Sequence, residues 1–325
     1  MAKILVTGAT GCLSNALAKY LSAQGHQVLA QGRDARAGQL LQAHGIEFIS
    51  FDLRANYPTQ AFQQVDIVFH CAALSTAWGK AEDFQAINVT ATQRLLDAAR
   101  KADVARFVFA SSPSIYANGK DRFNLAEDAE LPANFPSHYA RTKYEAECLV
   151  LAADRQGAMR TSALRPRAIY GTGDRSLMPR LLQAIRRGRV PMIGGGQSRI
   201  DITHVSDAAQ AMALAGFSDN ACGEVFNITS GKAYSFSELL AAVCALNGAQ
   251  PREIHISYGN AMRLAKGLEF LHRIFAPDRE PVLTCQAVAS LGRSLTLDIS
   301  KAQKKLGYRP AVAIEDGIKD YAGNL

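Results

Sequence analysis

A tyrosine and a lysine stand four residues apart, at Tyr139 and Lys143, in the segment SHYARTKYEAE. On a helix, residues at this spacing lie on the same face, so the phenol and the ammonium can be neighbours. A nearby ammonium favours the phenolate and lowers a tyrosine pKa that is ordinarily about 10. Such a tyrosine can donate or accept a proton near neutral pH. The same spacing also arises by chance on solvated helices, so the rest of the chain must decide.

A second chemical motif is the glycine turn VTGATGCLS, which follows the first apolar run of the chain. Glycines between a strand and a helix let backbone N–H groups approach a pyrophosphate, and the helix N-terminus attracts the anion. A third glycine is typical three residues on, where the small Ser14 stands here. We therefore predict a dinucleotide site with one imperfect position. The expected cofactor contacts in this turn are Gly8, Thr10, Gly11, Cys12 and Leu13.

The end of the second predicted strand reads AQGRD and bears on the choice of cofactor. An acidic residue there bonds the adenosine ribose of NAD, whereas an arginine accommodates the 2′-phosphate of NADP. Arg33 stands at this point and Asp34 follows it. Because a guanidinium suits a phosphate, NADP is the predicted cofactor, with NAD as the alternative. Asp52 and Leu53 close the third predicted strand and are expected to meet the adenine.

The order of strand and helix patterns along the sequence predicts the elements that position these residues. The sequence has 325 residues, 48% of them hydrophobic, which is ample for a large core. Strand and helix patterns alternate up to about residue 170, which predicts a parallel, doubly wound α/β sheet of the Rossmann type. We therefore predict a dinucleotide-binding domain over residues 1–170 and a smaller α/β substrate lobe over residues 171–325, interleaved with the first and not independent of it. The expected strands of the large sheet cover residues 3–7, 27–31, 47–53, 66–73, 106–112 and 161–166.

Charge and cysteine usage narrow the class of protein further. The formal net charge is +7, and the basic residues are scattered apart from RRGR at residues 186–189. A mild excess of this kind suits a small anionic ligand, and with no nucleic-acid motif in view we expect no nucleic-acid partner. The six cysteines form no CxxC pair, so no metal site is predicted. No apolar run approaches the ~18 residues of a membrane span and no leader pattern precedes the first strand, so we expect a cytoplasmic protein.

The motifs taken together resemble one family, the extended short-chain dehydrogenase/reductases of the NAD-dependent epimerase/dehydratase superfamily. They stand in the family's order along the chain. The matching segments are the glycine turn, DL at 52–53, HCAA at 70–73, NV at 88–89, SSPSIY at 111–116, YARTK at 139–143, LRPRAIYGTGD at 164–174 and ITHVSDAA at 202–209. So many ordered matches favour the chemical interpretation of the tyrosine–lysine pair.

The resemblance implies roles for individual side chains. Tyr139 matches the catalytic acid/base, and Lys143 matches the lysine that lowers its pKa and bonds the nicotinamide ribose. Ser112 matches the serine that hydrogen-bonds the substrate oxygen, with Ser111 as the alternative. Such a site moves hydride between the nicotinamide and a carbonyl carbon while the tyrosine exchanges the proton. Further cofactor contacts implied by the family's motifs are Ala72, Ala73, Ser111, Tyr139, Lys143 and Pro166.

Two stretches bear on the reaction and the substrate. Sugar-nucleotide dehydratases of this family place an Asp–Glu pair directly after the catalytic hydroxyl residue, where Pro113 and Ser114 stand here, so elimination of water is not expected. The C-terminal tail looks like the 3β-hydroxysteroid dehydrogenase branch, which includes bacterial 2-alkyl-3-oxoalkanoate reductases. We therefore predict an NAD(P)-dependent oxidoreductase that interconverts a ketone and a secondary alcohol on a bulky, apolar 3-oxo or 3-hydroxy substrate.

Two alternatives stay open at this point. The segment GGGQSRIDITHVSD also looks like the nucleotide-sugar epimerases, in which an arginine such as Arg199 meets a diphosphate. A catalytically silent NADP-binding sensor is the other, although such relatives usually lose the tyrosine that this chain keeps. The amphipathic segment Asn260–Ala276 is interpreted as a wall of the substrate cleft or as core, with membrane contact as a weaker alternative. Trp78 suits either the cleft or the core, and a homodimer is compatible with the sequence.

Overall fold

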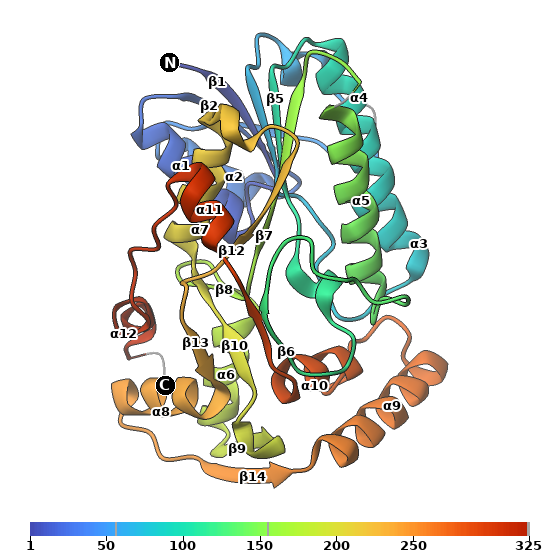
Figure 1. The fold of residues 1–325 in the computed structure, drawn as a ribbon, viewed down its shortest axis with the longest axis vertical. Coiled ribbons are helices and arrows are strands. Elements are labelled where there is room, and N and C mark those ends of the chain that lie inside the picture. The colour runs from blue at the N-terminus through green and yellow to red at the C-terminus, as the bar shows by residue number, and fades with distance from the viewer. Residues whose placement is uncertain (56, 155, 324–325) are drawn as a thin grey trace.

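Seven parallel strands form the main sheet of the computed structural model (Figure 1), which describes residues 1–325 apart from residues 56, 155 and 324–325. Their order is β12-β7-β5-β4-β1-β2-β3, and each neighbouring pair is parallel. Nearly all residues of β1, β4 and β5 are buried, as expected for strands covered on both faces. The strands are β1 (Lys3–Thr7), β2 (Gln27–Gly32), β3 (Glu47–Ser50), β4 (Ile67–His70), β5 (Arg106–Ala110), β7 (Arg160–Pro166) and β12 (Glu224–Ile228).

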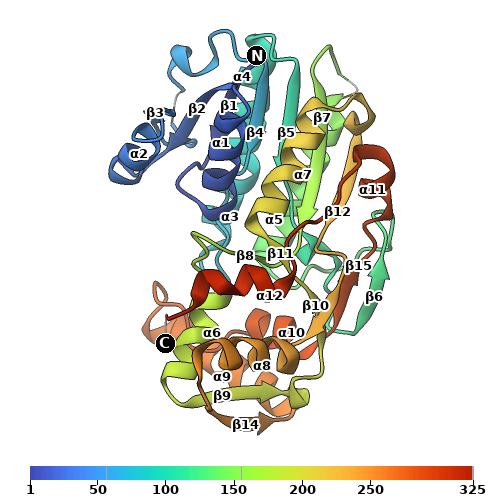
Figure 2. The same cartoon turned by 90° about the vertical axis from the view of Figure 1, so that its left-hand side faces the viewer.

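Helices cover both faces of this sheet, as the two views in Figures 1 and 2 show. Side chains alternate along a strand, so Ile4 and Val6 of β1 enter one hydrophobic core while Leu5 enters the other. The first core lies under α1 (Cys12–Ala23), α2 (Ala35–Gln42), α7 (Val205–Phe217) and α11 (Ser300–Leu306). The second lies under α4 (Ala91–Lys101) and α5 (His138–Asp154), with α3 (Ala81–Phe84) leading into α4. The predicted doubly wound Rossmann fold is confirmed.

The chain passes more than once between the large sheet and a smaller lobe. Strand β12 and helix α7 follow residue 170 yet belong to the large sheet and its cover, whereas β6 (Arg122–Leu125) precedes it and joins the lobe. The proposed division of labour, with the cofactor bound by residues 1–170 and the substrate selected by residues 171–325, therefore stays a prediction. Three strands also end earlier than expected, because the residues after Ser50, His70 and Ala110 leave the sheet at its carboxyl edge.

The smaller lobe lies beneath the carboxyl ends of the large sheet in the orientation of Figure 1. A mixed sheet, ordered β13-β10-β15-β6, contains β13 (Ala233–Ser235), β10 (Arg199–Asp201) and β15 (Leu295–Leu297). Two parallel pairs flank it, β8 (Ile169–Tyr170) with β11 (Thr203–His204) and β9 (Arg189–Ile193) with β14 (Arg252–Ile256). The lobe's helices are α6 (Leu177–Arg186), α8 (Phe236–Asn247), α9 (Tyr258–Phe275), α10 (Cys285–Gly292) and α12 (Ile314–Gly317). Its core is a separate cluster that includes Met178, Leu182, Ile200 and Leu240.

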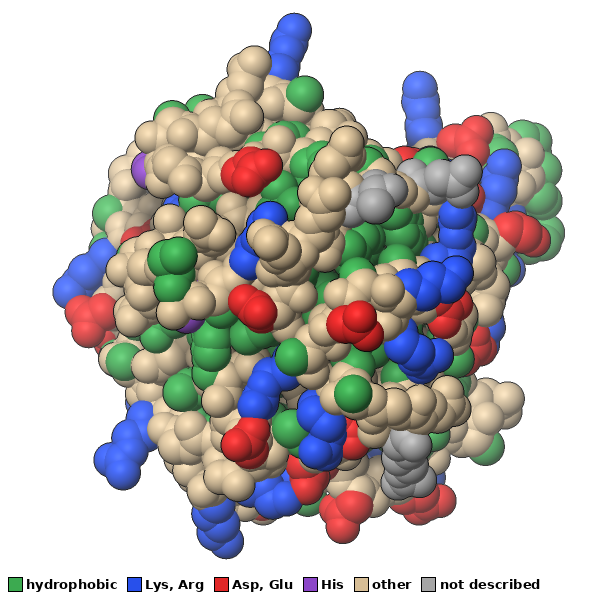
Figure 3. All heavy atoms as spheres, turned by 90° about the horizontal axis from the view of Figure 1, so that it is seen from above, with side chains coloured by type: hydrophobic (Ala, Val, Ile, Leu, Met, Phe, Trp, Pro, Cys, Tyr) green, Lys and Arg blue, Asp and Glu red, His purple; other side chains and the backbone are tan. Residues whose placement is uncertain are grey.

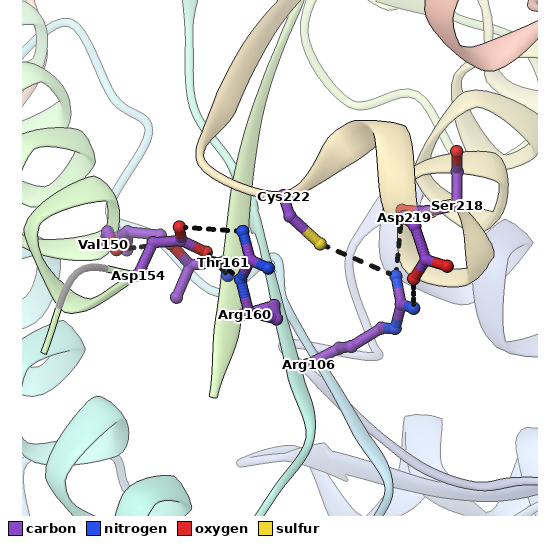
Figure 4. Close-up of polar contacts among 8 residues, drawn as sticks. All are labelled: Arg106, Val150, Asp154, Arg160, Thr161, Ser218, Asp219 and Cys222. Atoms are coloured by element: carbon purple, nitrogen blue, oxygen red, sulfur yellow. Dashed lines mark hydrogen bonds and ion pairs between the residues drawn. The ribbon is translucent and has the colours of Figure 1, made fainter. Parts of the chain in front are cut away.

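The opposite, amino-terminal edge of the large sheet is held by paired groups. Arg106, at the start of β5, donates to the Ser218 carbonyl at 2.9 Å and pairs with Asp219, while Arg160, at the start of β7, pairs with Asp154 (Figure 4). A hollow of about 10 Å³ lies between them, room for about one water molecule. Figure 3 looks onto this edge, where cationic and anionic side chains are mixed with apolar ones. The two ion pairs fasten the starts of β5 and β7 to the segments beside them.

Candidate active site

The carboxyl ends of β1, β4, β5 and β7 meet at one edge of the sheet, which is where open α/β sheets bind their ligands. The segments that follow these strands begin at Gly8, Cys71, Ser111 and Arg167. Most of the predicted site residues lie on these segments or at the start of the helix behind them. The topology therefore collects residues that are up to 160 positions apart in sequence, as the contact of Cys12 Sγ with the Thr172 carbonyl illustrates.

The glycine turn fits closely against the loop after β4. Gly8 has φ +68°, and a Cβ placed there would lie 2.7 Å from the Ala72 Cα, so glycine is required by conformation and by space. Thr10 packs against Gly32, where a Cβ would lie 3.0 Å from the Thr10 Cγ2. The predicted cofactor residues Gly8, Thr10 and Ala72 are thus brought together. Ala73 follows in a loop that the Asn88 side chain holds through the Leu74 backbone, with a 2.7 Å hydrogen bond from Leu74 N.

Helix α1 starts at this turn with Cys12 and Leu13. Among the described residues no side chain caps its N-terminus, and its first turn has no acidic residue. Its first N–H groups therefore remain available to an anion. Ser14, which stands in place of a third glycine, is buried and donates from its Oγ to the Gly8 carbonyl. The departure from the fingerprint is accommodated, because the hydroxyl ties the helix to the turn where a glycine would only allow close packing.

The expected adenosine end of the site lies after β2 and β3. Arg33 is exposed, while Asp34 is used as the N-cap of α2 and accepts from Arg36 N at 3.0 Å and Ala37 N at 3.1 Å. Asp52 forms a 2.7 Å ion pair with Arg54, and hydrogen bonds from Arg54 hold the pKa of Asp52 at about 2, with a further contribution from Arg33. The guanidinium groups of Arg33 and Arg54 therefore both lie close enough to Asp52 to stabilise its carboxylate. Leu53 is buried in the core beneath.

The predicted catalytic residues meet where α5 passes the end of β5. Ser112 acts on the Tyr139 phenol and lowers its pKa, while its Oγ donates to Ser114 Oγ at 3.0 Å. Lys143, one turn further along α5, donates from its Nζ to the Ala110 carbonyl at 2.5 Å. The Lys143 side chain is buried against the Phe109 ring, with its Nζ 3.9 Å from the ring centroid. Tyr139 and Lys143, one turn apart on α5, therefore both reach the segment at the carboxyl end of β5, where Ser112 and Ala110 lie.

The electrostatics of this pair differ from the expectation at the sequence level. Burial raises the pKa of Tyr139, and the hydrogen bond with Ser112 opposes that effect. Burial lowers the pKa of Lys143 to about 7, with Cys71 and Glu147 acting in the opposite direction. The predicted lowering of the tyrosine pKa by the lysine is not seen in this structure, because the ammonium is held by a backbone carbonyl instead of by the phenol.

A buried ion pair that sequence reasoning missed supports the site from behind. Glu147, one turn beyond Lys143, accepts a 2.6 Å hydrogen bond from Ser111 Oγ and a 2.9 Å hydrogen bond from Arg165 Nε. Both charged side chains are almost inaccessible, at 5% exposure for Arg165 and 2% for Glu147. Ser111 therefore faces Glu147 and Ser112 faces Tyr139, which favours Ser112 as the substrate-facing hydroxyl. The acidic residue in YARTKYEAE, eight positions after the tyrosine, was the available signal.

His70 and Trp78, two ring side chains near the site, are held in place by hydrogen bonds within the protein. His70 is buried between the Thr7 and Thr92 hydroxyls at 2.8 Å and 2.9 Å, and burial lowers its pKa to about 3. Trp78 donates from its Nε1 to the Pro277 carbonyl at 2.7 Å, so the loop after β4 is joined to the end of α9. Among the described residues, no group of three or more His, Cys, Asp or Glu side chains could hold a metal ion.

The fold and the motifs agree with a family assignment. The sequence profile described as the NAD dependent epimerase/dehydratase family matches residues 4–229. The chain belongs to this family, and the predicted extended short-chain dehydrogenase/reductase membership is confirmed. It is an enzyme of the NAD-dependent oxidoreductase and epimerase superfamily.

Individual relatives fall into two groups by the activities in their names. The chain is 34% identical over 330 residues to the 2-alkyl-3-oxoalkanoate reductase of Stenotrophomonas maltophilia, covering 98% of this chain and 97% of that protein. It is 30% identical over 295 residues to the 3beta-hydroxysteroid-dehydrogenase/decarboxylase isoform 1 of Arabidopsis thaliana, covering 87% of this chain and 67% of that protein. The solved structure of MoeE5 in complex with UDP-glucose and NAD matches with a TM-score of 0.79 at 30% identity, covering 98% of this chain and 96% of that one.

Proposed function

We propose that this chain is an NAD(P)H-dependent reductase that interconverts a ketone and a secondary alcohol, with Tyr139 as the proton donor. The observation that carries the proposal is the contact of Ser112 with Tyr139 at the carboxyl edge, with Lys143 one helical turn away. A hydroxyl pair of this kind can hold a carbonyl oxygen on which negative charge develops. Tyr139 then supplies the proton that turns the oxygen into a hydroxyl.

The cofactor proposed for this site is NADP(H), with NAD(H) as the alternative. The residues that would hold it are the N–H groups at the start of α1 for the pyrophosphate and Arg33, with Arg54 nearby, for the 2′-phosphate. When bound, the nicotinamide supplies hydride to the carbonyl carbon. Gly8 packs directly against Ala72, with which any Cβ at Gly8 would collide, so the turn is held close to the loop after β4.

The substrate proposed is a bulky, apolar 3-oxo or 3-hydroxy compound, and the smaller lobe is proposed to select it. Two kinds of observation support this. The relatives in Stenotrophomonas and Arabidopsis are named for 3-oxoalkanoate and 3-hydroxysteroid chemistry. In the lobe, α9 reaches the loop after β4 through Trp78, which also meets His272 edge-on at 6.3 Å between ring centroids. We propose that α9, joined in this way to the loop after β4, forms an apolar wall of the substrate site.

Nucleotide-sugar epimerisation is the second candidate. The likeness to MoeE5, whose structure contains UDP-glucose, favours it. Arg199, the residue expected to meet a diphosphate, is exposed and donates to the Ala233 carbonyl at 2.7 Å, which leaves its other nitrogens accessible. Pro113 and Ser114 begin the short helical turn Pro113–Tyr116 after Ser112 and provide no acid or base for water elimination.

A panel assay tests the proposal. The chain is incubated with NADPH or NADH and 3-oxo acids, 3-oxosteroids, UDP-glucose or UDP-glucuronic acid, and both cofactor oxidation and product formation are followed. Oxidation of the cofactor by a 3-oxo compound supports the reductase. Conversion of a UDP-sugar without net cofactor oxidation would replace it with the epimerase, and cofactor binding without any turnover would leave the NADP sensor.

A membrane surface is the partner proposed for α9. Among the described residues no helix is long and apolar enough to cross a bilayer. Helix α9, which runs along one side of the lobe in Figure 1, nevertheless exposes five large apolar side chains, namely Leu264, Phe270, Leu271, Ile274 and Phe275. Arg263, Lys266 and Arg273 are exposed on the same helix, whereas its acidic residue Glu269 is turned inward to Cys285 N at 2.7 Å. Apolar and basic side chains side by side suit anionic lipid.

A further inference from the structure

Two arginines stand two residues apart at the end of β7, in the segment LRPR, and only one of them is paired. Arg165 has Glu147 as a buried partner and also donates to the Glu127 carbonyl at 3.1 Å. Arg167 is half-buried, and its Nε is fully inaccessible with no hydrogen-bond partner in the described part of the chain. No salt bridge among the described residues includes Arg167.

The surroundings of Arg167 make its charge costly. Burial lowers the pKa of its guanidinium, and Asp201 is the carboxylate that acts against this effect. Asp201 forms no salt bridge with it and already accepts a 2.6 Å hydrogen bond from Leu297 N. An Nε–H that is removed from water without an acceptor is unfavourable, and charges near the interior of a protein are generally paired. An anionic acceptor would compensate Arg167, and the described residues provide none.

The backbone brings Arg167 to the carboxyl edge of the sheet, the edge at which the catalytic groups also lie. Its N–H donates to the Ile228 carbonyl at 3.0 Å and so continues the ladder of β7 with β12, after which Ala168 turns the chain with φ +43°. Arg165 lies on the face covered by α5, whereas Arg167 follows the end of β7, where its carbonyl accepts from Thr203 Oγ1 at 2.5 Å. The neighbouring strand β5 ends at Ala110, and the N–H of the next residue, Ser111, donates to the Leu164 carbonyl at 2.7 Å. Strands β5 and β7 pair as far as Ala110 and Leu164, so the two segments leave the sheet side by side, with Ser112 two residues after Ala110 and Arg167 three residues after Leu164.

We propose that Arg167 binds the carboxylate of the substrate and that the enzyme is therefore selective for 3-oxo or 3-hydroxy acids over their neutral analogues. This inference rests on the reductase proposed above and names the charged end of its substrate. The planar guanidinium matches a carboxylate with two parallel hydrogen bonds, whereas a lysine at the same place would offer a single point charge. Such a contact lets a buried arginine distinguish substrates of similar apolar bulk.

The test compares a 2-alkyl-3-hydroxy acid with its methyl ester in the oxidative direction, where both are chemically stable. The variants are Arg167→Met, which keeps the stem and removes the charge, and Arg167→Lys, which keeps the charge and removes the fork. Arg309→Met, an exposed arginine elsewhere on the chain, controls for the change in net charge. We expect KM for the acid to rise at least ~10-fold in Arg167→Met, the effect of one charge-assisted hydrogen bond, to recover only partly in Arg167→Lys, and KM for the ester to stay unchanged. Equal losses on acid and ester, or a wild-type preference for the ester, would overturn the proposal.

A binding measurement separates this inference from the reductase itself. Calorimetric titration of the cofactor-loaded chain with dodecanoate, methyl dodecanoate and UDP asks which anion Arg167 serves, whether or not turnover is seen. Loss of dodecanoate binding in Arg167→Met, with UDP unaffected, supports the carboxylate site even if the chosen alcohols prove to be poor substrates. Loss of UDP binding instead would assign Arg167 to a nucleotide and contradict both proposals, and unchanged binding of all three would leave it a structural residue.

Discussion

Glu147 and Lys143, one helical turn apart on α5, hold consecutive residues of the same strand end. Lys143 donates to the Ala110 carbonyl, and Glu147 accepts from the Ser111 hydroxyl at 2.6 Å. The next position along the strand end is Ser112, which contacts Tyr139. The catalytic helix is therefore positioned against β5 through three side chains at successive turns, and the charge of Glu147 is balanced by Arg165 from β7.

Breaking this buried pair should be more damaging than removing it whole. Glu147→Gln leaves the Arg165 charge without a carboxylate and should cost about 3–5 kcal/mol in the free energy of unfolding. The double variant Glu147→Leu/Arg165→Met removes both charges and should cost less than either single change. Urea unfolding of Glu147→Gln, Arg165→Met and the double variant measures the difference. A double variant that loses as much as the two single losses combined would mean that the two side chains act independently.

Tyr139→Phe removes only the phenol oxygen, so folding and cofactor binding should persist. We expect turnover on the true substrate to fall at least ~10²-fold, the lower range for loss of general acid–base catalysis. Ser112→Ala should also slow turnover, because it removes the hydroxyl that contacts Tyr139. Steady-state kinetics with cofactor fluorescence titration separate the two effects. Near-normal turnover in Tyr139→Phe would show that the proton comes from another group.

The stability of the cofactor-free protein should depend on pH through Lys143. Burial lowers the pKa of this lysine to about 7, whereas an unfolded lysine titrates at about 10.4. Between these two pKa values the unfolded chain binds more protons than the folded chain, so Lys143 makes the free energy of unfolding rise with pH from about 7 upward. Below about pH 7 the lysine is charged in both states, and the full cost of burying that charge destabilises the fold. Urea unfolding from pH 6.5 to 9.5 should show a smaller slope in Lys143→Met. Equal slopes in wild type and variant would place the lysine pKa near its ordinary value.

Arg33→Ala should weaken NADPH by roughly 1–3 kcal/mol, the scale of a charge-assisted hydrogen bond to phosphate, and leave NADH nearly unchanged. Arg36→Ala, an exposed arginine in the first turn of α2, is the matched control. Fluorescence titration with both cofactors measures the four affinities. If Arg33→Ala weakened both cofactors equally, Arg33 would not be a ligand of the 2′-phosphate.

The outward face of α9 should bind anionic lipid. Sedimentation with vesicles of phosphatidylcholine and phosphatidylglycerol is expected to carry down the wild-type chain at low salt and less of it at high salt, because the basic side chains are exposed and screened. The double variant Phe270→Ser/Phe275→Ser should no longer sediment with the vesicles. Phe123→Ser, at a phenylalanine outside α9 that is 57% exposed, is the control and should sediment like the wild type. No sedimentation of the wild type would remove the proposal, and a dimer that the double variant dissociates would assign the face to a second copy.

The sequence by itself determined what depends on local spacing. Tyr139 and Lys143 share a helix face because they lie four residues apart, and the alternation of strand and helix patterns predicts a parallel sheet whose carboxyl ends collect the motifs. The glycine turn is equally local, since Gly8 needs its positive φ whatever surrounds it. These features follow from backbone periodicity and from the conformations open to individual residues.

Only the tertiary structure decided which groups are partners. Arg165 and Arg167 look equivalent in LRPR, yet Arg165 is neutralised by Glu147 from α5, whereas Arg167 has no salt-bridge partner in the described part of the chain. Lys143 was expected to act on the Tyr139 phenol, but it donates to a carbonyl that β5 supplies from 33 residues earlier. Strand β12 completes the large sheet from beyond the predicted boundary at residue 170. Such pairings depend on how distant segments pack, because the free energy of burying a charge is set by neighbours that local sequence does not specify.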